Sequence, residues 1–153
     1  MLIRMKTWAL FLLTILIASM LCACGNSASE TPSTSDTPLA VADKVEVVYF
    51  HRAQRCNSCI YAETGTRHTL ETYFKDELAS NELTFKAVNF EDKESAAIVK
   101  KYGAFTSSLF INTIRDGTDY IDEVKEIWFF VGNDKAFVEV VKSKIEESLE
   151  EIR

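Results

Sequence analysis

The most reactive side chains of this sequence are two cysteines separated by two residues, in the segment Cys56-Asn57-Ser58-Cys59. A cysteine thiolate is a nucleophile, and it is also a ligand for soft metal ions. Two sulfurs at this spacing can exchange a disulfide with the thiols of another protein, brace a loop as a static disulfide, or hold a metal ion together. The segment alone leaves these three interpretations open.

The elements around the two cysteines favour redox chemistry. The β-branched and aromatic run Val45–Phe50 predicts a buried strand, and a helix is expected to begin at Cys56 and to continue to about Ala79. A sulfur at a helix N-terminus lies beside unpaired N–H groups, and the helix dipole favours its thiolate. We therefore predict that Cys56 is the nucleophile. Cys59, one turn further and buried by the helix, is then the resolving thiol.

Three further residues could support this chemistry. Arg55 directly precedes Cys56, and its positive charge, with that of Arg52, would favour the thiolate. His51 is a candidate to accept the thiol proton, although a histidine at a strand end can equally be an ordinary exposed side chain. No buried carboxylate is evident as a base. If the site holds a soft metal ion instead, the expected ligands are Cys56, Cys59 and His51.

The remaining elements follow from hydrophobic periodicity and turn residues. We expect a strand at Leu83–Val88, a helix from Asp92 to about Gly103, a strand at Ser108–Ile114, a turn at Asp116-Gly117, a strand at Val124–Val131 and a C-terminal helix capped by Asp134. The helical crossover favours a parallel strand pair, and the Asp-Gly turn favours an antiparallel hairpin. The predicted fold class is α/β, with a central mixed four-stranded sheet flanked by helices. Within it, Trp128-Phe129-Phe130 is expected in the core, or else on a docking surface.

This arrangement, with Cys-x-x-Cys after the first strand, resembles the thioredoxin fold over residues 44–153. Two features depart from that family's pattern. Phe50 stands where many thioredoxins bury an aspartate, and no proline occurs near Thr106 and Ser107, where the family has a cis-proline facing the disulfide. A cis bond without proline is costly, so we expect a trans loop with Thr106 or Ser107 beside the sulfurs.

A shorter string resembles a narrower group of thioredoxin-like proteins. Its residues are Val48-Tyr49-Phe50-His51-Arg52, then Arg55-Cys56 and Cys59. Some members of this group carry the family name of an ArsF-type subunit of a nitrophenyl-compound nitroreductase. That name implies an accessory role beside a membrane redox system.

The N-terminal segment has the pattern of an export signal. Arg4 and Lys6 precede an apolar stretch that is short for a membrane-spanning helix and typical of a secretory signal. The residues Leu21-Cys22-Ala23-Cys24 resemble the bacterial lipobox. This resemblance implies cleavage after residue 23 and lipidation of Cys24, which would anchor the protein in a bilayer on the extracytoplasmic face of the bacterial cell envelope. An ordinary signal peptide cut near Ala23, or an uncleaved anchor helix, is the alternative.

The predicted organisation is a signal peptide at 1–23, the lipidated cysteine and a Ser/Thr/Pro-rich tether at 24–43, and a thioredoxin-like domain at 44–153. The chain has 153 residues and a formal net charge of −6, which disfavours nucleic acid as a partner. We predict a membrane-anchored thiol–disulfide oxidoreductase acting on protein thiols or disulfides, or on a membrane redox protein. Its redox group is the disulfide Cys56–Cys59, with no other cofactor. Soft-metal or metalloid binding, or a non-catalytic accessory subunit, is the alternative.

Overall fold

The computed structural model describes residues 42–153 of the chain, and the predicted signal peptide, Cys24 and most of the tether lie outside the described residues. In chain order the elements are β1 (Lys44–His51), α2 (Asn57–Tyr73), α3 (Lys75–Ser80), β2 (Leu83–Asn89), the 3₁₀ turn η1 (Lys93–Ser95), α4 (Ala96–Tyr102), β3 (Ser108–Arg115), β4 (Thr118–Glu123), the 3₁₀ helix η2 (Lys125–Phe130) and α5 (Asp134–Glu150). No helix in the described part of the chain is both long and apolar enough to cross a membrane.

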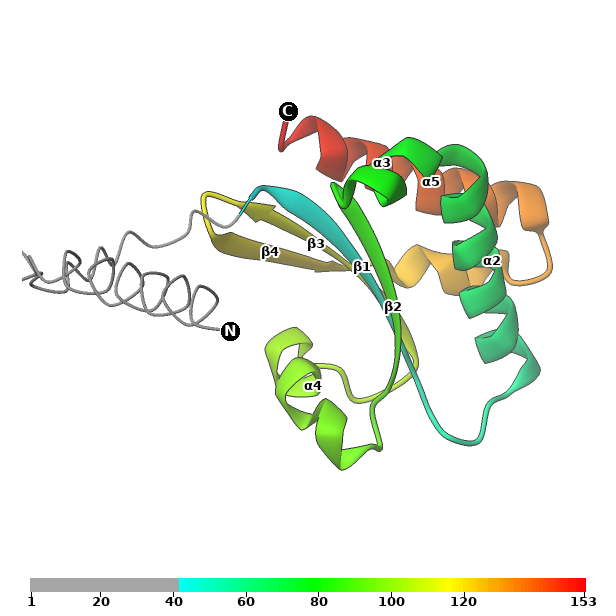
Figure 1. Ribbon diagram of the computed structural model, residues 1–153. Coiled ribbons are helices and arrows are strands. Elements are labelled where there is room, and N and C mark those ends of the chain that lie inside the picture. The colour runs from blue at the N-terminus through cyan, green and yellow to red at the C-terminus, as the bar shows by residue number, and fades with distance from the viewer. Residues whose placement is uncertain (1–41) are drawn as a thin grey trace, which may run out of the picture. The chain divides into compact units, whose positions relative to one another are not determined.

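The strands form one four-stranded mixed sheet in the order β2-β1-β3-β4 (Figure 1). β1 pairs in parallel with β2, and it pairs antiparallel with β3 on its other side. β3 pairs antiparallel with β4. The predicted fold class, an α/β domain with a mixed four-stranded sheet and flanking helices, is confirmed.

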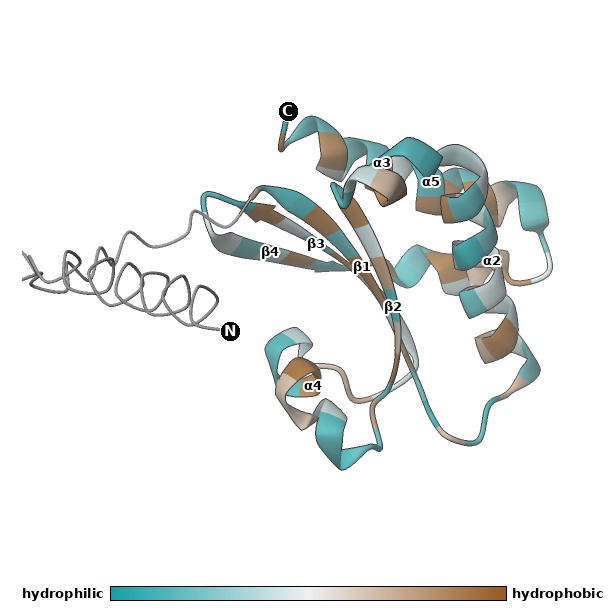
Figure 2. Cartoon of the chain, viewed as in Figure 1, coloured by the Kyte–Doolittle hydropathy of each residue, from teal (hydrophilic) through white to brown (hydrophobic). Residues whose placement is uncertain are grey.

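β1 is buried on both of its faces, and each face belongs to a different core. Val45, Val47 and Tyr49 pack with α2, α5 and η2, whereas Val48 and Phe50 pack with α4. Alternate residues of a strand point to opposite faces, so a run that is apolar at every position from Val45 to Phe50 except Glu46 suits this central strand. Figure 2 shows the hydrophobic stretches on the central strands and mixed, largely hydrophilic helices around them.

The fourth strand lies earlier in the chain than the sequence predicted. We expected a strand over Val124–Val131, but β4 ends at Glu123 and Lys125–Phe130 is a 3₁₀ helix. The Asp116-Gly117 turn has positive φ at both residues, and this tight connection requires the partner strand to start at once, at Thr118. The apolar residues after β4 cover the core beside α5 in a helical conformation. Their recurrence every three or four positions suits a helix with one face on the core.

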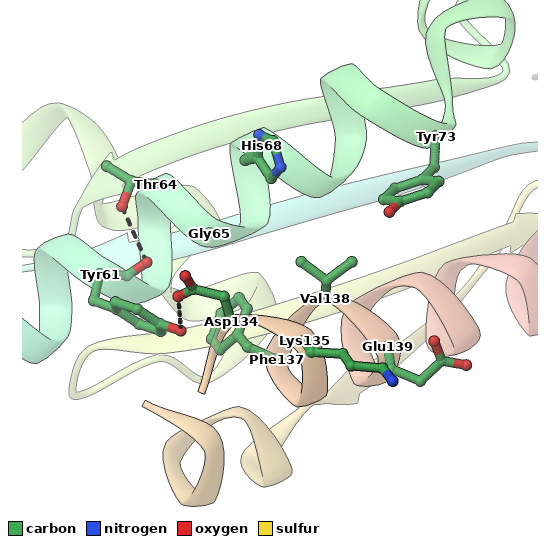
Figure 3. Close-up of a pocket in the computed structure, with 10 residues that line it drawn as sticks. All are labelled: Tyr61, Thr64, Gly65, His68, Tyr73, Asp134, Lys135, Phe137, Val138 and Glu139. Atoms are coloured by element: carbon green, nitrogen blue, oxygen red, sulfur yellow. Dashed lines mark hydrogen bonds between the residues drawn. The ribbon is translucent and has the colours of Figure 1, made fainter. Parts of the chain in front are cut away.

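The single helix predicted from Cys56 to Ala79 is two helices in the structure. The chain leaves helical geometry at Phe74, whose side chain is buried, and α3 begins at the next residue. Gly65 does not interrupt α2. At Gly65, α2 packs closely against α5, because a Cβ at this position would lie 2.8 Å from the ring of Phe137 on α5 (Figure 3).

The start of α5 also differs by one residue from the prediction. Asn133 is the N-cap, and its side-chain oxygen accepts a hydrogen bond from the backbone N–H of Ala136 at 3.3 Å, whereas Asp134 is the first helical residue. The predicted helix after Asp92 begins with the 3₁₀ turn η1 and ends at Gly103, which has the left-handed conformation that favours glycine at this position.

Candidate functional site

Cys56 and Cys59 form a disulfide at the junction between the loop after β1 and helix α2. Cys56 is the N-cap of α2, and its sulfur accepts a hydrogen bond from the backbone N–H of Cys59 at 3.2 Å. The hydroxyl of Ser58 lies 3.1 Å from the same sulfur. Cys56 is exposed, and Cys59 is partly exposed rather than buried as predicted. Of the two cysteines, the one at the helix N-terminus is therefore the more exposed to a partner thiol.

A groove of about 540 Å³ opens beside the disulfide. Its lining residues are Arg52, Gln54, Cys56, Cys59, Thr106, Ser107 and Trp128. The prediction that Thr106 or Ser107 flanks the sulfurs is confirmed, and both do. All peptide bonds in residues 42–153 are trans, as expected for a loop without proline.

Arg55 does not extend freely beside Cys56. Its guanidinium forms an ion pair with Glu63, which lies one turn beyond Cys59 on α2. Arg67 approaches the other carboxylate oxygen of Glu63 at 3.3 Å. Burial disfavours the charged carboxylate, but hydrogen bonding and charge from Arg55, together with Arg67 and His51, outweigh it and hold the pKa of Glu63 below its usual value.

Tyr49 connects the sheet to the second cysteine. Its side chain is fully buried at the end of β1, and its hydroxyl donates a hydrogen bond to the carbonyl oxygen of Cys59 at 2.8 Å. Burial raises the pKa of Tyr49 to about 12, with the nearby charge of Arg55 opposing and that of Glu63 adding to the shift. The phenol therefore stays protonated and able to donate at physiological pH.

His51 and Arg52 occupy different places at the end of β1. The Nδ1 atom of His51 lies 2.9 Å from the carbonyl oxygen of Arg52. Because a carbonyl can only accept, Nδ1 carries a proton, and in the neutral ring Nε2 is left as the acceptor. His51 is not among the residues that line the groove, whereas Arg52 is. Of the two, Arg52 is the cation placed beside the sulfurs.

Two residues of this site were missed by the sequence analysis. Glu63 follows Cys59 by four positions, a spacing that places both side chains on the same helix face, so the spacing was a usable signal. Its side chain is only 13% exposed, which the sequence did not indicate because glutamate is usually solvated. Tyr49 was identified only as part of a strand, and no sequence pattern showed which backbone carbonyl its hydroxyl would reach.

Three exposed apolar side chains are sequence neighbours of residues that line the groove. Phe105 directly precedes Thr106 and is 83% exposed, and Phe129 directly follows Trp128 and is also 83% exposed. Ile60, next to Cys59, is exposed as well. The prediction that Trp128-Phe129-Phe130 lies in the core is therefore right for Trp128 and Phe130, which pack against it, and wrong for Phe129.

A second groove lies between α2 and the start of α5 (Figure 3). Tyr61 and His68 line it from α2, and the hydroxyl of Tyr61 donates to Asp134 of α5 at 2.7 Å. Within residues 42–153, no group of three or more His, Cys, Asp or Glu side chains is arranged to hold a metal ion.

Comparison with known proteins does not assign a family. No family model matches the chain, and no curated protein matches it. Among solved structures, one titled "Structure of a malarial protein" is similar, with 15% sequence identity and a TM-score of 0.39 over 65% of this chain and 96% of that chain. This likeness is too low to carry a functional argument.

Proposed function

We propose that this protein is a thiol–disulfide oxidoreductase of the thioredoxin-like superfamily, with Cys56 as the nucleophile and Cys59 as the resolving thiol. The observation that supports it most strongly is the exposed Cys56 sulfur at the N-terminus of α2, bonded to a backbone N–H and facing an open groove. The same N–H and the helix dipole would stabilise a Cys56 thiolate after reduction.

The reaction is an exchange of electrons between two dithiol–disulfide pairs. The Cys56 thiolate attacks one sulfur of a partner disulfide, forming a mixed disulfide and releasing the partner's other sulfur as a thiolate. Cys59 then gives up its proton to solvent and attacks the Cys56 sulfur. This step forms the Cys56–Cys59 disulfide and releases the second partner thiolate. The protein loses two electrons, the partner gains them, and the reverse sequence oxidises a partner dithiol.

The surroundings of the groove favour a protein as the partner. Phe105 and Phe129 are large apolar side chains left exposed on the segments that carry Thr106 and Trp128. Exposed apolar groups on the segments that line a groove beside a reactive sulfur suit a polypeptide that brings its own apolar residues along with a cysteine. A membrane redox protein with such a segment is one partner of this kind.

The site of action is proposed from the sequence alone. If Cys24 is lipidated as the lipobox resemblance implies, the domain acts on the extracytoplasmic side of a bacterial membrane, tethered through residues 24–43. That compartment allows the disulfide to persist between reaction cycles. An accessory role beside a membrane redox system, as in the ArsF-type subunit family, is compatible with this placement.

The direct test is reduction of insulin disulfides by the full chain in detergent, with dithiothreitol or thioredoxin reductase as electron donor. The proposal expects turnover by the wild type and loss of turnover in Cys56→Ser. Thr72→Ala, which removes a hydroxyl at an exposed position of the same helix and keeps both cysteines, is the matched control and should retain activity. Wild-type protein no faster than Cys56→Ser would reject the proposal.

A further inference from the structure

Two charged side chains near the disulfide in the sequence, Arg55 and Glu63, are buried to a degree that is unusual for charged residues. Glu63 has a 13% exposed side chain and Arg55 a 26% exposed one, and they pair directly. The Nε atom of Arg55 is buried and has no hydrogen-bond partner in the structure. A buried donor without an acceptor is costly, so its position beside the disulfide segment calls for an explanation.

Each of these two charged residues lies near one cysteine of the redox pair. Arg55 is covalently adjacent to Cys56, and Glu63 follows Cys59 by one helical turn. Tyr49, whose hydroxyl contacts the Cys59 carbonyl, is influenced by the charges of both Arg55 and Glu63. The charges of Arg55 and Glu63 therefore lie next to Cys56 and within one helical turn of Cys59, where each can influence the energy of a thiolate.

We propose that Glu63 is a positioning residue that sets the reduction potential of the Cys56–Cys59 pair, by holding Arg55 in place and offsetting its positive charge. This inference rests on the proposed redox function. Reduction of the disulfide adds two electrons and two protons and yields two thiols, of which that of Cys56 is the one expected to ionise by releasing its proton to solvent. A neighbouring cation stabilises that thiolate and so favours the reduced form, whereas the Glu63 carboxylate opposes this effect.

The charges around Glu63 predict opposite effects for two substitutions. Glu63→Gln keeps an oxygen that can accept from Arg55 but removes the negative charge, which leaves the charge of Arg55 uncompensated. Arg67→Gln removes the outer cation, 3.3 Å from Glu63, and leaves the carboxylate less neutralised. His51, at the end of β1, also acts electrostatically on Glu63, and it is not substituted in either variant.

The experiment measures two quantities for each full-chain variant in detergent. One is the equilibrium constant for reduction by glutathione, and the other is the pKa of Cys56 from the pH dependence of its alkylation by iodoacetamide. For Glu63→Gln we expect an equilibrium shifted about threefold or more toward the reduced protein, with a lowered Cys56 pKa. For Arg67→Gln we expect both to move in the opposite direction. Glu71→Gln, an equal charge change at an exposed position of the same helix, is the control and should match the wild type.

The outcomes separate this inference from the proposed function. Wild-type protein that does not exchange with glutathione would overturn both. Normal exchange in the wild type, with Glu63→Gln unchanged or shifted toward the oxidised form, would overturn the inference alone. If Glu63→Gln is unfolded at the assay temperature, Arg67→Gln decides, and wild-type values for that variant would overturn the inference.

Discussion

The hydroxyl of Tyr49 donates a hydrogen bond to the backbone carbonyl of Cys59, 2.8 Å away. This contact joins the buried end of β1 to the first turn of α2, ten residues further along the chain. It fixes the second cysteine relative to the sheet, while the first cysteine remains exposed at the helix N-terminus. The backbone of Cys59 is thus anchored to the sheet, and Cys56 is the more exposed cysteine of the pair.

Tyr49→Phe removes only the hydroxyl and leaves the carbonyl of Cys59 without this donor. Loss of such a bond costs about 0.5–1.5 kcal/mol, and we expect a decrease of that size in the free energy of unfolding. Urea unfolding of the oxidised protein measures it. Tyr73→Phe, on the half-exposed tyrosine at the end of α2, is the control and should unfold at the wild-type urea concentration. Equal midpoints for both variants would contradict the anchoring role.

Cys59→Ser should trap the reaction at its first stage. Without the resolving thiol, the mixed disulfide between Cys56 and its partner has no intramolecular route to release. Incubation with oxidised glutathione should give a stable adduct, seen by intact mass spectrometry. The Cys56→Ser variant should form at least tenfold less, because the remaining Cys59 lacks the N-cap position. Equal adduct formation by the two variants would reverse the assigned roles.

The two exposed phenylalanines should matter for protein partners and not for small thiols. Burial of one such side chain against a partner contributes about 1.5–3 kcal/mol, which corresponds to roughly tenfold or more in kcat/KM. We expect Phe129→Ser, and Phe105→Ser, to lower kcat/KM for insulin by this factor while exchange with glutathione is unchanged. Tyr120→Ser, on the exposed face of β4, is the control. Wild-type insulin kinetics in both phenylalanine variants would exclude this docking surface.

The Arg55–Glu63 ion pair predicts a specific pH dependence of stability. The pKa of Glu63 in the folded protein lies below its ordinary value of 4.5, so the unfolded chain takes up this proton first as the pH falls. The pair therefore stabilises the fold above about pH 4.5, and this contribution is lost as the pH falls through the folded pKa. The stability difference between wild type and Glu63→Gln should shrink from about pH 6 to about pH 3 in urea titrations. A constant difference would argue against the pair.

Gly65→Ala tests the contact between α2 and α5. Alanine favours a helix over glycine by about 1 kcal/mol, but its Cβ would lie 2.8 Å from the buried Phe137 ring. Overpacking costs about 1–3 kcal/mol, so we expect net destabilisation in the wild type. In a Phe137→Leu background the clash is relieved, and the same substitution should stabilise. Equal effects in both backgrounds, measured by urea unfolding, would rule out the close approach.

The fold could be predicted largely from the sequence, because its central strands carry strong local signals. The run at Val45–Phe50 is buried on both faces, and the Asp116-Gly117 turn determines a hairpin. The prediction failed at Val124–Val131, where one apolar run suits either a strand or a helix facing the core. The tight turn at Asp116-Gly117 decides between the two. The strand that pairs with β3 begins directly after this turn, at Thr118, so the later apolar run is left to form the helix.

The candidate site could be predicted only in part. The two cysteines, and Thr106 and Ser107 beside them, follow from the sequence and from the resemblance to the thioredoxin fold. The pairing of Arg55 with Glu63 does not, since Arg55 can turn toward Cys56 or toward α2. The folded structure turns Arg55 toward α2, where it pairs with the largely buried Glu63, and that burial depends on tertiary packing.

The central claim is that Cys56 and Cys59 exchange two electrons as one couple. Equilibration of the full chain with glutathione buffers of varied redox ratio, followed by acid quenching and thiol alkylation, measures it directly. We expect a single reversible transition in which both cysteines become open to alkylation together, with a two-electron dependence on the glutathione ratio. A disulfide that stays closed across the range, or that opens and cannot re-form, would contradict it.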